Sequence, residues 1–142
     1  MNAYRNILYA INLNDENITS IIYALEFARL FSSRIHIVYV NDPQAGYRHP
    51  TDREDAVALR VRETVPESLL ENLDVVYAAS KGNIAEEIVR YAQDYQIDLI
   101  MVGHKHRSRL YTALFDSDDV SIIDTALLPV LVIPDYSKSC HI

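Results

Sequence analysis

The 142-residue chain contains three glycines, and Gly103 is the only one in the stretch where a βα phosphate loop is expected. A loop that wraps phosphate uses glycine because glycine adopts positive φ angles and lets backbone N–H groups reach an anion without an intervening Cβ. The later positions of this stretch carry His106 and Asp116 instead. The scarcity of glycine therefore argues against a glycine-lined nucleotide site.

Cysteine is also scarce, since Cys140 is the only one, and a single cysteine excludes an internal disulfide. The sequence starts without an apolar signal core, and no apolar run reaches membrane-spanning length. We therefore expect a cytoplasmic protein with no membrane association. The net charge of −7 disfavours a nucleic-acid partner, because an acidic surface repels phosphate.

Familiar hydrolytic motifs are missing as well. The chain has no G-x-S-x-G elbow, no Walker loop and no H-E-x-x-H sequence. We expect that the protein is not an enzyme. A catalytic site assembled from scattered residues is the alternative that the motif search leaves open.

What the chain does have is a set of short, nearly continuous apolar runs. The four strongest cover residues 7–11, 35–40, 99–102 and 130–133, and a weaker run at 73–78 reads as a fifth strand at a sheet edge. Runs of this length and continuity are typical of strands that are buried on both faces of a parallel sheet.

Apolar stripes at helical spacing lie between these runs and predict amphipathic helices. The first stripe consists of Ile18, Ile21, Ile22, Leu25 and Ala28, and a later one of Ile84, Ile88, Val89 and Ala92. Residues 52–64 predict a further helix of mixed charge, and residues 117–127 predict the last one.

Local signals mark the ends of two of these helices. Asn83, with Glu86 three residues later, resembles a capping box, and Glu86 with Arg90 forms a favourable i,i+4 pair. Pro66 either interrupts the helix at 52–64 or starts a new one.

The resulting order, β-α-β-α-β-α-β-α-β, predicts an α/β fold with an open, doubly wound five-stranded parallel sheet and helices on both faces, which is a Rossmann-like architecture. We expect one domain over residues 1–142, with a flexible tail from about residue 137 to 142. Such sheets bind ligands at the carboxyl ends of their strands. Asn12, Val40 and Gly103 follow or close three strands, so they should cluster there.

Four segments carry a resemblance that covers essentially the whole chain. They are an opening strand at 4–13, a glycine turn into a helix at 82–88, a strand ending in glycine at 98–104, and a terminal strand at 129–134. In this order and spacing they resemble the universal stress protein family. The resemblance implies the adenine nucleotide alpha-hydrolase-like form of the fold.

The family divides on one motif, since its ATP-binding members carry G-x2-G-x9-G-[S/T]. Gly103 and Ser117 fill the first and last positions, whereas His106 and Asp116 replace the second and third glycines. Asn12 stands where those members use an aspartate at the adenine. The chain is therefore similar to the A-type branch, which is not expected to bind ATP, and to the small enterobacterial proteins with a glycine-histidine-rich loop.

Three carboxylates gather at the predicted start of the last helix, at Asp116, Asp118 and Asp119. They complement the positive end of the helix dipole and would repel a triphosphate there. A divalent cation on these carboxylates, or a metal pair or pH switch at His104 and His106, is the alternative to capping and a solvated loop. No matching Cys/His pattern is present, so we expect no metal.

The resemblance implies a stress-response protein that has no cofactor and acts through dimerisation and protein partners. The family typically pairs through its last strand, and an exposed apolar edge strand needs a partner or a cover. We expect a homodimer, with a heterodimer of related paralogues left open. The interface residues would be Val130, Leu131, Val132 and Ile133.

The alternative is an adenine-nucleotide-binding stress protein with a divergent phosphate loop and slow ATP hydrolysis. Basic side chains can hold phosphate without glycine amides. Here they would hold ATP or another adenine nucleotide with Mg²⁺, while Asn12 and Val40 face the base and Gly103 meets the ribose. The residues of this candidate site are Asn12, Val40, Gly103, His106, Arg107, Arg109, Asp116 and Ser117.

Overall fold

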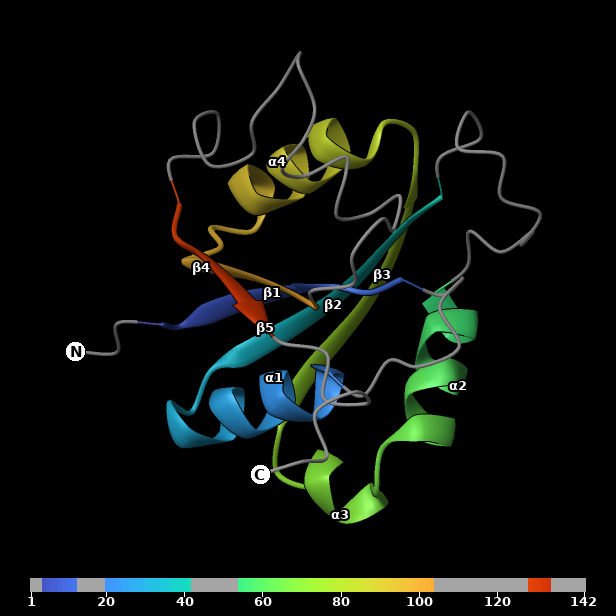
Figure 1. Cartoon of the computed structure of the whole chain (residues 1–142), viewed down its shortest axis with the longest axis vertical. Helices are drawn as coiled ribbons and strands as arrows, with labels where there is room; N and C mark the ends of the chain where they lie inside the picture. Colours follow the sequence, from blue (N-terminus) through green and yellow to red (C-terminus); the bar gives the residue numbers. More distant parts are fainter. Residues whose placement is uncertain (1–3, 13–19, 42–53, 104–127, 134–142) are drawn as a thin grey trace, which may run out of the picture.

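The computed structural model describes residues 4–12, 20–41, 54–103 and 128–133, which hold five strands and four helices (Figure 1). In chain order the elements are β1 (Asn6–Ala10), α1 (Ser20–Leu30), β2 (Arg34–Asn41), α2 (Glu54–Thr64), α3 (Glu67–Leu70), β3 (Asp74–Lys81), α4 (Ile84–Asp94), β4 (Leu99–Gly103) and β5 (Val130–Ile133).

The five strands form one parallel sheet in the order β3-β2-β1-β4-β5. Figure 1 shows α1 and α4 on opposite sides of this sheet, with α2 and α3 on the side of α1. The predicted open, doubly wound α/β fold is therefore confirmed. Of the described helices, none combines the length and the apolar composition needed to cross a membrane.

Each strand contributes to two cores because side chains alternate between the faces of a sheet. Tyr9, Ile37 and Met101 pack with α1 and α2 on one face, whereas Leu8 and Val38 pack with α4 on the other. Burial on both faces explains why β1, β2 and β4 read as continuous apolar runs.

The weak run at residues 73–78 is confirmed as a strand, β3, and it lies at an edge of the sheet. Pro66 occupies the N-cap position of α3, so it starts a new helix, and α2 begins at Glu54, close to the predicted start. The predicted helix at 117–127 and the tail at 137–142 lie outside the described residues.

The cap at Asn83 is confirmed, because its side-chain oxygen accepts the N–H of Glu86 at 3.0 Å. The ion pair predicted between Glu86 and Arg90 is wrong. Arg90 forms an ion pair with Glu87 at 2.8 Å instead. The Glu87 carboxylate is held in place because it also accepts a hydrogen bond from the Ser80 hydroxyl on β3 at 2.5 Å.

Candidate functional site

The direction of strand addition reverses between β1 and β4, and this switch point is where sheets of this type form a ligand crevice. Asn12 lies two residues beyond β1, Gly103 closes β4, and Val40 lies near the end of β2. The strand register places all three at the same end of the sheet. The predicted clustering is thus observed, while the binding role of these residues stays a prediction.

Ser20, the first residue of α1, packs against Gly103 at this end of the sheet. A Cβ on Gly103 would lie 2.5 Å from Ser20 Oγ and 3.1 Å from Ser20 Cβ, which is closer than folded proteins tolerate without movement. The Ser20 hydroxyl is also hydrogen-bonded to the Tyr9 hydroxyl at 2.6 Å. Glycine at position 103 therefore lets the start of α1 approach β4.

Tyr9 and Ser20 are not among the site residues predicted from the sequence. A usable signal was present, because a tyrosine inside an otherwise aliphatic strand needs a partner for its hydroxyl group. Tyr9 is 2% exposed, so that hydroxyl lies inside the fold rather than in water. The pair adds two hydroxyl groups to the switch point.

The described floor of the switch point offers little reactive chemistry. Ile11 and Val40 are buried and apolar, and the polar groups contributed are the Asn12 amide and the Tyr9–Ser20 hydroxyls. Across residues 4–12, 20–41, 54–103 and 128–133, no cluster of three potential metal ligands occurs. These groups can pack against an apolar ligand and hydrogen-bond to it.

The phosphate end of the predicted site lies outside the described residues. It comprises His106, Arg107, Arg109, Asp116 and Ser117, together with the alternative metal ligands His104, Asp118 and Asp119. The basic-loop hypothesis and the acidic-cluster hypothesis therefore both stay predictions.

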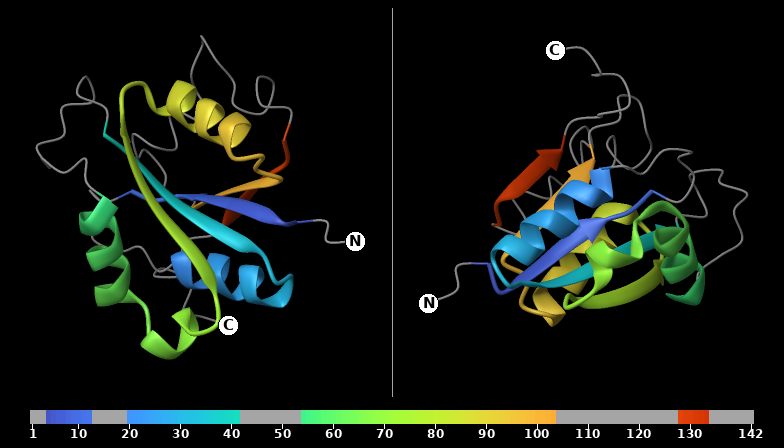
Figure 2. Two further views of the ribbon diagram at one scale, coloured as in Figure 1. Left: turned by 180° about the vertical axis from the view of Figure 1, so that it is seen from behind. Right: turned by 90° about the horizontal axis from the view of Figure 1, so that it is seen from below.

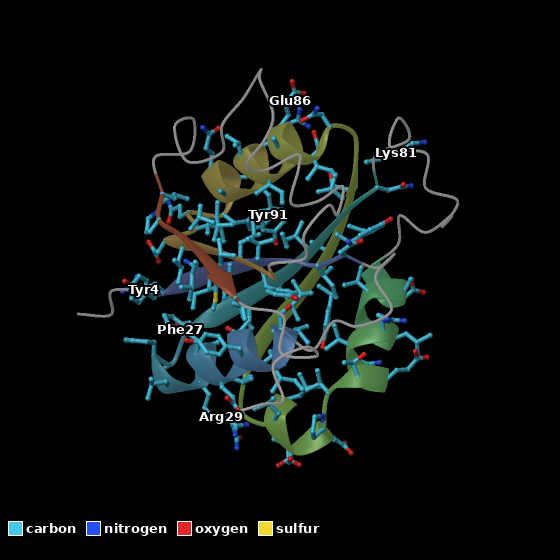
Figure 3. All side chains as sticks on the ribbon, viewed as in Figure 1. Tyr4, Phe27, Arg29, Lys81, Glu86 and Tyr91 are labelled. Carbon is cyan, nitrogen blue, oxygen red and sulfur yellow. The ribbon has the colours of Figure 1, made fainter. Side chains whose placement is uncertain are left out.

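His36 in β2 is a buried, hydrogen-bonded core residue. Its Nδ1 lies 2.7 Å from the Tyr91 hydroxyl, its Nε2 lies 3.5 Å from Asn6 Oδ1, and its ring packs edge-on against Tyr91, which is labelled in Figure 3. Burial lowers the pKa of His36 from its ordinary value, the nearby Arg34 charge lowers it further, and Asp74 opposes this. His36 thus belongs to the α4 face of the core and lies away from the switch point.

β5, which carries the predicted dimer interface, lies at the edge of the sheet opposite β3. Val130, Leu131 and Val132 are partly exposed, whereas Ile133 is 1% exposed within the subunit. Leu131 packs toward the α1 side and Val132 toward the α4 side. Because the exposed fraction of Ile133 covers the whole residue, neither its side chain nor its backbone is open to a partner in this structure.

Comparison of the sequence and the fold with known proteins identifies a family. The sequence model described as "Universal stress protein family" matches residues 3–134. No curated protein matches the chain in sequence. Solved structures share its fold at low identity, and three of them illustrate the range.

The universal stress protein UspA from Lactobacillus plantarum is 23% identical with a TM-score of 0.62, and the match covers 92% of this chain and 97% of that one. A universal stress protein in complex with cAMP is 17% identical with a TM-score of 0.65, over 92% and 97%. The universal stress protein from Archaeoglobus fulgidus in complex with dAMP is 19% identical with a TM-score of 0.56, over 92% and 98%. With the family match over nearly the whole chain, the conclusion is that this chain belongs to the universal stress protein family.

Proposed function

We propose that this protein is an A-type universal stress protein, which acts in the cytoplasm by associating with other proteins and does not bind ATP. The observation that carries this proposal is the contact between Gly103 and Ser20. Gly103 is the one glycine kept from the family's phosphate-binding motif, and its packing against Ser20 is a sufficient reason for a glycine there. It therefore gives no reason to infer a nucleotide.

The other motif positions support the same proposal. His106 and Asp116 replace glycines whose backbone amides would face phosphate, and Asp116 adds a negative charge. Asn12 replaces the aspartate of the ATP-binding members with a neutral amide. Each change removes one contact that the resemblance assigns to ATP.

The partner that we propose first is a second copy of the chain, paired through β5. In the described part of the chain β5 pairs on one side only, with β4, and Val130 to Val132 are apolar and partly exposed. An edge of this kind is stabilised when another strand pairs with it. Pairing by β5 would give the stress protein a dimeric form whose other surfaces are open to further partners.

Adenine-nucleotide binding is the second candidate function. It is favoured by the two solved relatives whose structures hold cAMP and dAMP, and by the apolar floor around Val40 and Ile11. In this alternative, Arg107 and Arg109 would take the place of the missing amides. A monophosphate makes a weaker demand on the loop than a triphosphate does.

Two measurements on the purified protein test the proposal. Acid release of bound small molecules, followed by chromatography, should yield no adenine nucleotide, and sedimentation should give the mass of a dimer. Stoichiometric cAMP, AMP or ATP in the extract would contradict the nucleotide part. A monomer at micromolar concentration would contradict the dimer part.

A further inference from the structure

The second edge of the sheet, at β3, is a long strand with one unpaired side. β3 pairs along its whole length with β2, and no other described strand pairs with it. Seen from behind in Figure 2, β3 runs in front of the rest of the sheet, with α2 and α4 to either side. Residues 75–80 carry no charge and are all partly exposed. Such an edge can pair with a further strand.

One hydrogen bond fixes the direction of the backbone groups in β3. The Gly82 N–H donates to the Asn41 carbonyl at 3.0 Å, toward β2. Because backbone groups alternate in direction along a strand, the N–H and C=O groups of Val75, Tyr77 and Ala79 point to the open edge. The side chains of these three residues pack on the α2 face of the sheet.

A hollow of about 570 Å³ lies beside this edge, between α2, α3 and β3. The apolar side chains in its lining are Val65, Leu70, Leu73 and Val75. Charged groups are supplied by Arg62, Glu67 and Glu71, and Tyr77 adds a phenol. A hollow of this size and mixed lining can hold one or two side chains.

The Arg62 guanidinium is near enough to Tyr77 to act on its titration. Burial raises the pKa of the Tyr77 phenol above its ordinary value, and the positive charge of Arg62 opposes this. The cation of the hollow thus lies at its Tyr77 end. The carboxylates Glu67 and Glu71 come from α3 and the turn after it.

A second hollow, of about 530 Å³, adjoins the first because both are lined by Glu71 and Leu73. Its other walls are mainly polar and come from the end of α1, from α3 and from the start of β3. We call these two adjoining hollows the trough. It lies beside the amino-terminal half of β3, and its lining is mixed in the first hollow and mainly polar in the second.

The cation in the lining of the second hollow, Arg29, already has partners. Arg29 donates to the carbonyls of Ser68 and Leu69 at 2.9 Å and of Glu71 at 3.2 Å. Arg29, labelled in Figure 3, lies in the last turn of α1. Glu67 and Glu71 make no ion pair with any described residue. The trough consequently offers carboxylates to a basic group.

We propose that the open edge of β3 and this trough bind an extended segment of another protein, which pairs as a sixth strand, inserts an apolar side chain into the first hollow and sets a lysine or arginine beside Glu71. Strand addition of this kind takes its affinity from main-chain hydrogen bonds and its specificity from side-chain pockets. Side chains on one face of a strand are two residues apart. The segment should therefore carry its apolar and basic residues separated by one residue.

Charge favours such a segment over a second copy of this chain. A second copy of this chain would carry the same net charge of −7, whereas a basic segment is attracted to the carboxylates of Glu67 and Glu71. Like charges at an interface oppose association. This docking site is independent of the proposed β5 dimer and of the nucleotide question.

Phage display of random seven-residue peptides on the full-length protein supplies the probe, and the selected peptides are then synthesised. We expect them to share an apolar residue and a lysine or arginine two positions away, on either side of it. Ala79→Pro removes one outward N–H without touching the bonds to β2, and it should weaken peptide binding roughly tenfold. Ala79→Val keeps that N–H and should bind as the wild type does.

Glu71→Lys tests the charge without altering the strand. It should weaken binding of the selected peptides by roughly tenfold, because a charge-assisted contact becomes a repulsion. Glu86→Lys makes the same charge change on the exposed start of α4, on the opposite face, and should leave binding unchanged.

Several results would overturn the proposal. The selection should converge on one pattern, so a failure to recover any binding peptide would refute the proposal. Equal binding of the selected peptides to the wild type, to Ala79→Pro and to Glu71→Lys would refute it as well. Peptides that bind equally well after N-methylation of their backbone would show a pocket without strand addition. Dissociation of an oligomer by Ala79→Pro, but not by Ala79→Val, would assign the edge to a second copy.

Discussion

Ser20 Oγ lies 2.5 Å from the point that a Cβ on Gly103 would occupy, and the Tyr9 hydroxyl holds that oxygen in place at 2.6 Å. The contact joins the first turn of α1 to the end of β4, directly at the switch point of the sheet. A glycine that looks like the remnant of a phosphate loop is thus required by the packing of two elements of the fold.

Gly103→Ala should lower the free energy of unfolding by about 1–3 kcal/mol, because the added methyl overlaps Ser20 and the start of α1 must move. Urea denaturation followed by circular dichroism measures the change. Ser20→Gly in the same chain removes both close atoms, so it should recover most of the loss. An alanine variant as stable as the wild type would show that α1 moves freely and that packing does not explain the glycine.

Val132→Lys should convert the proposed dimer into a monomer, because it places a charge at the middle of the open β5 edge. Sedimentation velocity at micromolar concentration reads the mass directly. Val132→Thr keeps the branched shape without a charge and should remain dimeric. Leu131→Lys makes the same test on the other face of the strand, and a dimer that persists in both lysine variants would rule out this interface.

Asn83→Ala should destabilise the protein by about 1 kcal/mol, since the Asn83 side chain accepts the Glu86 N–H at the start of α4. The shift in the urea midpoint provides the measurement. Asn83→Asp keeps an oxygen acceptor in the same place and is the matched control. If alanine and aspartate behave alike, the cap does not contribute to stability.

The stability of the protein should fall as the pH drops below the ordinary histidine pKa of 6.5, in part because of His36. Burial lowers the pKa of His36 in the folded chain, so in this range the unfolded chain binds more protons and the free energy of unfolding decreases with falling pH. Above that range His36 is neutral in both states and the effect vanishes.

His36→Phe should therefore flatten the pH dependence between about pH 7.5 and pH 5.5, measured by urea denaturation at several pH values. The variant also loses the hydrogen bond between His36 and the Tyr91 hydroxyl, so Tyr91→Phe serves as the control. It removes the same hydrogen bond but keeps the titrating ring, and its pH dependence should match that of the wild type. Equal slopes for His36→Phe and the wild type would refute the assignment.

Much of this fold could be predicted because both faces of the sheet are covered. Because β1, β2 and β4 are buried on both faces, each is recognisable in the sequence as a continuous apolar run. The cap at Asn83 is a local signal that depends on neighbouring residues alone. β3 gave a weaker run because an edge strand is partly exposed.

The features that escaped prediction depend on contacts between distant segments. Nothing near Gly103 in the sequence indicates that Ser20 lies against it, and only the fold of α1 over β4 creates the contact. Spacing predicts an ion pair between Arg90 and Glu86, whereas the hydrogen bond from Ser80 on β3 holds Glu87 in position to form it. The trough at β3 likewise needs α1, α2 and α3 together.

Calorimetric titration of the protein with ATP and Mg²⁺ tests most directly whether the divergent loop has lost the ability to bind ATP. The wild type is compared with a chain carrying Asn12→Asp, His106→Gly and Asp116→Gly, which restores the family's ATP motif around Gly103 and Ser117. The account predicts no heat of binding for the wild type and measurable binding for the restored chain. Micromolar binding of ATP by the wild type would contradict it, and Arg107 and Arg109 would then be the residues to substitute.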